Sequence, residues 1–272
     1  MLDAPSLQGM KSKMQSAWNA GDYATFATFM EPGAEEILLS WEIEAGQRML
    51  DVACGTGQIC IPASRKGVAV TGIDFATRSI EAARSRGERE QLGVTFDVGD
   101  AEAMPYEDGS FDVVTSMVGA MFAPRAEQVA SEMLRVCRSG GRIRMVNWTA
   151  EGFVGQMFQT IGQFAPPSPD IPSPMLWGDA DKVRVRFGDS VDRLSITKQI
   201  YPLWDYPFGV AEVVEFFFQN YGPMQKTLAS LSDHEGQKLR TELEGVFSAN
   251  SIEVQNGIRL IAEFLHVDAL KR

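Results

Sequence analysis

The feature that most constrains the fold is an alternation of short apolar runs with helical segments between residues 47 and 150. The apolar runs predict five strands, at residues 48–53, 68–74, 94–100, 111–117 and 142–148. Each run is nearly continuous in apolar residues, which is typical of strands that are buried on both faces. Helices between such strands join them in parallel. The sequence therefore predicts an α/β fold built on a doubly wound, mostly parallel sheet.

The segments outside this core predict a helical cap and two more strands. Residues 10–45 and 208–247 show helical patterns, while residues 193–204 and 257–270 predict the strands that bring the sheet to seven. The stretch "APPSPDIPSP", residues 165–174, cannot continue a helix and predicts a stiff loop. We therefore divide the chain into an N-terminal helical lid (1–45), a ligand-binding core (46–150), a cap insertion with the Pro-rich loop (151–190), and a segment that completes the sheet with inserted helices (191–272).

The stretch "RMLDVACGTGQIC", residues 48–60, leads from the first strand into a glycine-rich turn. Gly55 and Gly57 suit a backbone that adopts positive φ or passes close to a ligand. A dinucleotide fingerprint would place a third small residue where Cys60 stands, so the match to GxGxxG is incomplete. No GK[ST] follows, as a P-loop requires. The turn alone indicates a nucleotide-like ligand without naming it.

Three acidic residues stand at the ends of consecutive predicted strands. Asp51 precedes the turn, Asp74 lies 17 residues after Gly57, and Asp100 follows Asp74 by 26 residues. The carboxyl ends of adjacent parallel strands meet at the crevice where such sheets bind ligands. There Asp74 could accept hydrogen bonds from both hydroxyls of a ribose, and Asp100 could face an adenine amine. A lone strand-end aspartate is more often a turn residue, but three in succession indicate a nucleoside site.

Composition excludes several classes of partner. With 25 Lys and Arg against 36 Asp and Glu, the net charge is −11, and a body this acidic repels the phosphates of nucleic acid. No apolar run approaches the roughly 20 residues of a membrane span, and the first residues lack an apolar signal core, so we expect no membrane association. Three cysteines without a CxxC pair predict a location in the reducing cytoplasm.

Four stretches resemble the successive motifs of class I S-adenosylmethionine-dependent methyltransferases: "LDVACGTG", "GID", "GDAEAMPYEDGSFDVV" and "LRVCRSGGRIRMVNW". The likeness covers residues 46–149 and is greatest to the small-molecule (type 11) group that includes the ubiquinone and menaquinone biosynthesis methyltransferases. It implies S-adenosylmethionine as cofactor, with its methionine part over the glycine turn, its ribose on Asp74 and its adenine on Asp100 and Ala101. The cofactor-binding residues implied by the resemblance are Asp51, Ala53, Gly55, Gly57, Asp74, Phe75, Asp100, Ala101, Glu102, and, beside the sulfonium, Ser116 and Met117.

Charge favours this cofactor over a dinucleotide. NAD would bring two phosphate charges to the helix N-terminus after the turn, whereas S-adenosylmethionine brings a sulfonium cation and an ammonium group. Three carboxylates on an acidic chain suit the cation. Two alternatives stay open: an NAD(P)-dependent dehydrogenase built on the same sheet, and a protein that binds S-adenosylmethionine without catalysis.

Motifs that the sequence lacks narrow the range of possible methyl acceptors. The fourth strand leads into "TSMVGAMFAP", without the Asn/Asp-Pro-Pro-Tyr motif of enzymes that methylate nucleobase amines, and no carboxylate cluster suited to Mg²⁺ stands near it. We expect in-line transfer to a small, largely apolar acceptor without a metal ion, and we assign no catalytic residue because both histidines suit structural roles. The N-terminal helices also offer a surface for a homodimer. Candidate acceptor-binding residues are Trp18, Met121, Phe122, Trp148, Phe153 and Trp177.

Overall fold

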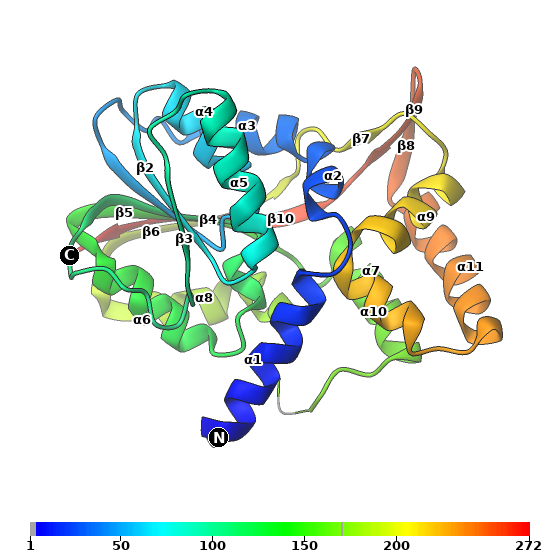
Figure 1. Ribbon diagram of the computed structural model, residues 1–272. Helices are drawn as coiled ribbons and strands as arrows, with labels where there is room; N and C mark the ends of the chain where they lie inside the picture. The colour runs from blue at the N-terminus through cyan, green and yellow to red at the C-terminus, as the bar shows by residue number, and fades with distance from the viewer. Residues whose placement is uncertain (1–3, 170) are drawn as a thin grey trace.

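A seven-stranded sheet forms the centre of the protein (Figure 1). The structure is a computed structural model that describes residues 4–169 and 171–272. The strand order is β3-β2-β1-β4-β5-β10-β6, and β10 alone runs antiparallel to its neighbours in the sheet. The strands are β1 (Arg48–Val52), β2 (Ala69–Asp74), β3 (Thr95–Val98), β4 (Phe111–Met117), β5 (Cys137–Trp148), β6 (Val191–Ile200) and β10 (Glu263–Lys271). The predicted seven-stranded, mostly parallel, doubly wound sheet is confirmed.

Helices cover both faces of this sheet, which is why its central strands are apolar throughout. On one face lie α4 (Cys60–Arg65) and α5 (Thr77–Arg89), which contact β2 and β3. On the other lie α6 (Ala126–Val136) and α8 (Ala180–Phe187), which pack on each other and on β4, β5 and β6. Four of the five residues of β1 are buried as a result.

A second group of elements stands beside the carboxyl edge of the sheet. It contains α7 (Phe153–Phe164), α9 (Val210–Asn220), α10 (Gly222–Ala229), α11 (Asp233–Ala249), and a small antiparallel sheet of β7 (Asp205–Tyr206), β9 (Gly257–Leu260) and β8 (Ser251–Val254). Its core is aromatic: the ring of Phe247 meets Phe153 edge-on at 4.7 Å and Phe217 at 4.9 Å between centroids. These contacts hold α7, α9 and α11 together.

The N-terminal helices connect the two halves. They are α1 (Ala4–Trp18), α2 (Tyr23–Thr28) and α3 (Glu31–Ser40). In Figure 1, α1 runs between the sheet and the helices on the opposite side, where it packs on α10, while α2 packs on α9. Just after α3, the indole of Trp41 donates a hydrogen bond to His266 of β10 at 2.8 Å. That contact assigns His266 a structural role.

Two elements differ from the sequence prediction. The segment 257–270 forms two strands in two sheets: β9 pairs with β7 and β8, and β10 pairs with β5 and β6. The break lies at residues 261–262, where the Ile261 N–H donates to the Asn250 carbonyl and the Ala262 carbonyl accepts from the Tyr201 N–H. Strand β5 also begins earlier than predicted, at Cys137 instead of residue 142, directly after α6 ends at Val136, so the Gly140–Gly141 pair lies within β5.

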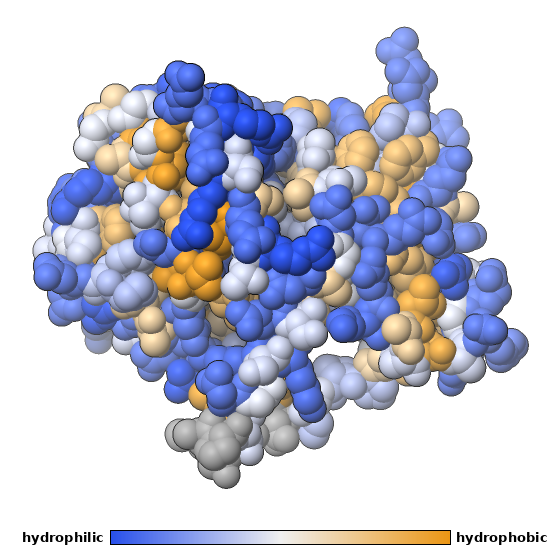
Figure 2. Space-filling view, in the orientation of Figure 1, coloured by the Kyte–Doolittle hydropathy of each residue, from blue (hydrophilic) through white to orange (hydrophobic). Residues whose placement is uncertain are grey.

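The surface shows hydrophobic residues in separate patches. Hydrophilic residues cover most of the face drawn in Figure 2. The large exposed hydrophobic side chains are spread over different elements: Leu39, Val98, Val185, Ile200 and Ile252. Within the described part of the chain, none of the helices combines the length and the apolar character that crossing a membrane requires.

Candidate functional site

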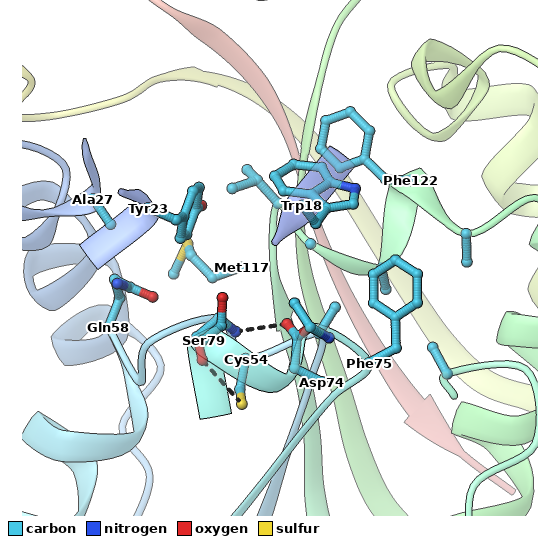
Figure 3. Close-up of a pocket in the computed structure, with 18 of the residues that line it drawn as sticks. Trp18, Tyr23, Ala27, Cys54, Gln58, Asp74, Phe75, Ser79, Met117 and Phe122 are labelled. Carbon is cyan, nitrogen blue, oxygen red and sulfur yellow. Dashed lines mark hydrogen bonds between the residues drawn. The ribbon is translucent and has the colours of Figure 1, made fainter. Parts of the chain in front are cut away.

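One large cavity opens at the carboxyl edge of the parallel strands, between the sheet and the N-terminal helices (Figure 3). Including the open solvent at its mouth, it encloses about 1350 Å³. Its floor comes from the turn after β1 and the ends of β2, β3 and β4, and its other walls from α1, α2, β5, α7 and α9.

The glycine turn after β1 follows a backbone path with left-handed conformations. Ala53, Gly55 and Gly57 have φ values of 56°, 55° and 84°. A Cβ on Gly55 would lie 3.2 Å from the ring of Tyr23, and one on Gly57 would lie 3.2 Å from Phe96. Glycine at these positions avoids both the backbone strain and the contacts. The turn thus keeps its backbone close to the cavity floor.

Asp74, the last residue of β2, holds this turn in place. Its Oδ2 accepts a hydrogen bond from the Gly55 N–H at 2.9 Å, and its Oδ1 accepts one from the Ala76 N–H at 2.8 Å (Figure 3). Burial raises the pKa of this carboxyl, while the backbone hydrogen bonds oppose the shift. A carboxylate has about four acceptor positions, so both oxygens can still accept bonds from a ligand in the cavity.

Asp51 is the most deeply buried acid of the site, with 1% of its surface exposed. The hydroxyl of Thr115 donates to its Oδ1 at 3.0 Å, and the thiol of Cys60 donates to its Oδ2 at 3.5 Å. Desolvation raises the pKa of Asp51 to about 7. The two hydrogen bonds oppose this shift, and the nearby charge of Asp74 adds a small contribution to it. No cation pairs with it among the described residues, so a cationic ligand would find an uncompensated carboxyl here.

Asp100 and Glu102 form the third acidic position, and it is occupied by a lysine. Asp100 Oδ1 accepts a hydrogen bond from the Glu102 N–H at 2.9 Å, and its Oδ2 accepts one from Lys11 Nζ of α1 at 2.5 Å. Lys11 also pairs with Glu102. Glu102 in turn receives the backbone N–H of Arg125 at 2.6 Å and its guanidinium at 2.7 Å.

The far half of the cavity is aromatic, and none of the described residues that line it carries a charged side chain. The indole of Trp204 and the hydroxyl of Tyr201 line it but are already satisfied, by Tyr206 at 3.0 Å and the Met30 carbonyl at 2.8 Å. The aromatic residues of this wall are Trp18, Tyr23, Phe26, Phe122, Trp148, Tyr201, Trp204, Phe217 and Tyr221. Within the described structure, the hydroxyls of Tyr23 and Tyr221 have no hydrogen-bond partner.

Most residues expected from the sequence lie at this cavity, and some do not. The lining includes Asp51, Ala53, Gly55, Asp74, Phe75, Asp100, Ala101, Met117, Trp18, Phe122 and Trp148. Gly57 lies below the floor against Phe96, Glu102 lies behind Asp100, and Ser116 is buried, where its hydroxyl donates to the Val52 carbonyl at 2.8 Å.

Three of the expected acceptor-binding residues pack elsewhere. Met121 is fully buried outside the lining, and Phe153 lies in the aromatic core against Phe247. Trp177 packs under the guanidinium of Arg186 at 4.5 Å. Each was expected to bind the acceptor because it is apolar, but an apolar side chain is equally suited to packing in the core. The described residues of the Pro-rich loop 165–174 also contribute nothing to the lining.

Sequence reasoning missed Lys11, Tyr23, Tyr201, Phe217 and Tyr221, all of which line the cavity. A helical spacing was available as a signal for α1, where Lys11, Met14 and Trp18 share one face and all reach the cavity. Phe217 and Tyr221, four residues apart, offered the same signal at the end of α9. Among the residues that the structure describes, no group of three His, Cys, Asp or Glu side chains is placed to hold a metal ion.

Comparison with known proteins agrees with this geometry. The family described as "Methyltransferase domain" matches residues 50–145. An uncharacterised protein of Mycobacterium tuberculosis is 34% identical over 238 residues, which is 86% of each protein. Demethylmenaquinone methyltransferase of Deinococcus radiodurans is 35% identical over 125 residues, 44% of this chain and 52% of that protein.

A solved structure shares the fold. Phosphoethanolamine N-methyltransferase 2 of Haemonchus contortus, in complex with phosphomonomethylethanolamine and S-adenosylhomocysteine, matches with a TM-score of 0.58 at 18% identity. The match covers 88% of this chain and 52% of that one. At this identity the likeness shows a common fold.

Proposed function

Because the chain belongs to the class I S-adenosylmethionine-dependent methyltransferase family, we propose that it methylates a small, largely apolar acceptor without a metal ion. S-adenosylmethionine is its methyl donor. One observation carries the proposal: a single cavity joins three strand-end carboxylates to an aromatic wall that carries no charge. The first part suits a cationic nucleoside, and the second suits an uncharged acceptor.

The residues at the sheet edge fit this cofactor. A Cβ on Gly119 would lie 2.3 Å from the Ala53 carbonyl oxygen, so the space above the turn depends on glycine. Asp74 holds the ribose hydroxyls with its remaining acceptor positions, and Asp51 holds the ammonium group of the methionine part. Asp100 accepts from the adenine amine, and the Ala101 N–H donates to the ring nitrogen. The acidic donor set favours a sulfonium compound over the two phosphates of NAD(P).

The bound cofactor supplies a methyl group already activated by its sulfonium, so the protein needs no nucleophile. The protein therefore has to align the acceptor with the methyl group and to exclude water. Alignment alone can lower the activation barrier by several kcal/mol. The aromatic wall does both. Burial raises the pKa of Tyr23 and of Tyr221, so both hydroxyls remain protonated near neutral pH. They act as hydrogen-bond donors that orient an acceptor oxygen or nitrogen, and not as bases.

The helices within residues 1–45 form a lid over both ligands in this proposal. Trp18 at the end of α1 contacts Tyr23, Phe122 and Tyr221, with centroid distances of 5.8, 5.2 and 5.6 Å. The lid therefore touches the cofactor end and the acceptor end of the cavity at once. We further propose that the net charge of −11 keeps nucleic acid from serving as the acceptor.

Two experiments test the proposal. Thermal unfolding with S-adenosylhomocysteine and with NAD(P) should show stabilisation by the former alone, because a ligand that binds only the folded state stabilises by RT ln(1 + [L]/Kd). A screen with isotopically labelled S-adenosylmethionine against small hydrophobic phenols, amines and acids should then find methyl transfer. Stabilisation by NAD(P) would favour a dehydrogenase. Cofactor binding with no transfer to any small molecule would favour a non-catalytic binder.

A further inference from the structure

Lys11 places a cation at the adenine end of the cavity, on the helix that covers it. Lys11, Met14, Gln15 and Trp18 lie on one face of α1 because their spacing follows the helical repeat. The Gln15 amide donates to the Phe75 carbonyl at 2.6 Å. With the 2.5 Å bond from Lys11 to Asp100, this makes two polar contacts between α1 and the ends of β2 and β3.

The two carboxylates that Lys11 bridges differ in their exposure and in whether they have another cationic partner. Glu102 has a fully buried side chain and already pairs with the guanidinium of Arg125. Asp100 is 39% exposed, and in the described part of the chain Lys11 is its single cationic partner. Its other oxygen, Oδ1, is taken by the Glu102 N–H. Lys11 therefore fills one of the remaining acceptor positions of Asp100 and neutralises its charge.

We propose that Lys11 is an intramolecular substitute for the adenine amine, and that it lowers cofactor affinity by competing for Asp100. The inference rests on the proposed function, in which Asp100 binds the adenine. An N–H of the adenine amine and the ammonium of Lys11 would approach the same oxygen at about 2.5–3 Å, so Lys11 fills one of its two acceptor positions and competes with the amine for this carboxylate. Binding of the cofactor moves Lys11 off Asp100.

The neighbouring Glu102 lowers the free energy that Lys11 loses when it leaves Asp100. Lys11 already contacts Glu102, so after leaving Asp100 it retains one carboxylate partner. Helix α1 thus shifts without losing its attachment to the end of β3. In the cofactor-free protein, the same ion pair keeps α1 closed over an empty acidic site and neutralises Asp100. Lys11 then sets both the closure of α1 and the affinity for the adenine amine.

The test measures S-adenosylhomocysteine binding by calorimetry for the wild type, Lys11→Met and the control Lys13→Met. Lys13 is exposed on the same helix, so its loss makes the same change in net charge, and Met is as good a helix former as Lys. A partly exposed ion pair contributes about 0.2–1 kcal/mol. Lys11→Met should therefore tighten binding by about 1.4- to fivefold, and Lys13→Met should leave it unchanged. Weaker or unchanged binding by Lys11→Met would overturn the proposal.

Hydrogen exchange of the free protein separates this inference from the proposed function. Without ligand, Lys11→Met should raise amide exchange across residues 4–18, and Lys13→Met should not. If wild-type protein fails to bind S-adenosylhomocysteine, the proposed function fails, yet the exchange data still report whether Lys11 holds α1. Equal exchange in all three proteins would refute the role of Lys11 in closing the lid.

Discussion

Replacing Asp51 by asparagine should stabilise the cofactor-free protein at neutral and alkaline pH while weakening cofactor binding. Asp51 is buried without a cationic partner among the described residues, so its charged form is disfavoured until a cation enters the cavity. An asparagine carries no charge, and its amide oxygen still accepts the bond from Thr115. The protein therefore retains an unfavourable charge for the benefit of its ligand.

The magnitude follows from the pKa. Burial raises the pKa of Asp51 to about 7 in the folded protein, against about 3.9 in an unfolded chain. Because the folded state holds the proton more tightly, this group costs no stability below the unfolded pKa and its full penalty above the folded pKa. A difference of about three units, at 1.36 kcal/mol per unit, gives a penalty of roughly 4 kcal/mol. More than half of it develops between pH 5 and pH 8.

The assay is urea unfolding of the wild type and of Asp51→Asn at pH 5, 6.5 and 8. The variant should gain stability relative to the wild type as the pH rises. His266, whose pKa burial lowers, titrates in both proteins and cancels in the difference. The exposed Asp189→Asn is the control and should stay within about 0.5 kcal/mol at each pH. A stability difference that is equal at pH 5 and pH 8 would refute the reasoning.

Three further predictions follow from the site. Gly119→Ala should weaken S-adenosylhomocysteine binding at least tenfold in a thermal-shift assay, because its Cβ would collide with Ala53; Gly93→Ala, with nothing within 4 Å of the new Cβ, should not. Tyr221→Phe should raise the KM for the acceptor severalfold and leave kcat and cofactor affinity unchanged, since it removes one hydrogen-bond donor; a fall in kcat alone would contradict this. Excess EDTA should not change the transfer rate, whereas loss of activity restored by Mg²⁺ would show a metal requirement.

The sequence predicts the sheet and its acidic edge because both depend on local patterns. Strand β1, the turn with Gly55, and Asp74 at the end of β2 are specified by neighbouring residues along the chain. Their contact, the Gly55 N–H to Asp74 bond, follows from the parallel pairing of β1 and β2. In residues 257–270 the structure changes sheets at residues 261–262, but the alternation of buried residues continues across that break, at Ile258, Leu260, Ala262 and Phe264. The local pattern therefore does not mark the change of sheet.

The acceptor wall could not be predicted in the same way. Its residues come from α1, α2, β5, α9 and the connections between elements, and each is an aromatic side chain that a core would accept equally well. Trp148 lines the cavity, whereas Phe153, five residues later, packs against Phe247 in the core. Phe217 does both, since it reaches the cavity and also meets Phe247 at 4.9 Å. Only the tertiary arrangement separates a pocket residue from a packing residue.

The two halves of the cavity have separate structural origins, and this has a consequence for specificity. The acids lie at the ends of β1, β2 and β3, where backbone hydrogen bonds to Asp74 and Asp100 fix the carboxylates. The aromatic wall comes from the N-terminal helices and from the elements after β4. The backbone hydrogen bonds that fix Asp74 and Asp100 come from other parts of the chain. Changes in the wall can therefore alter the acceptor without disturbing the donor site, as expected when function is determined by elements added to a common fold. By this reasoning, substitutions in α9 should change which acceptor is methylated, whereas substitutions at the strand ends should affect all acceptors alike.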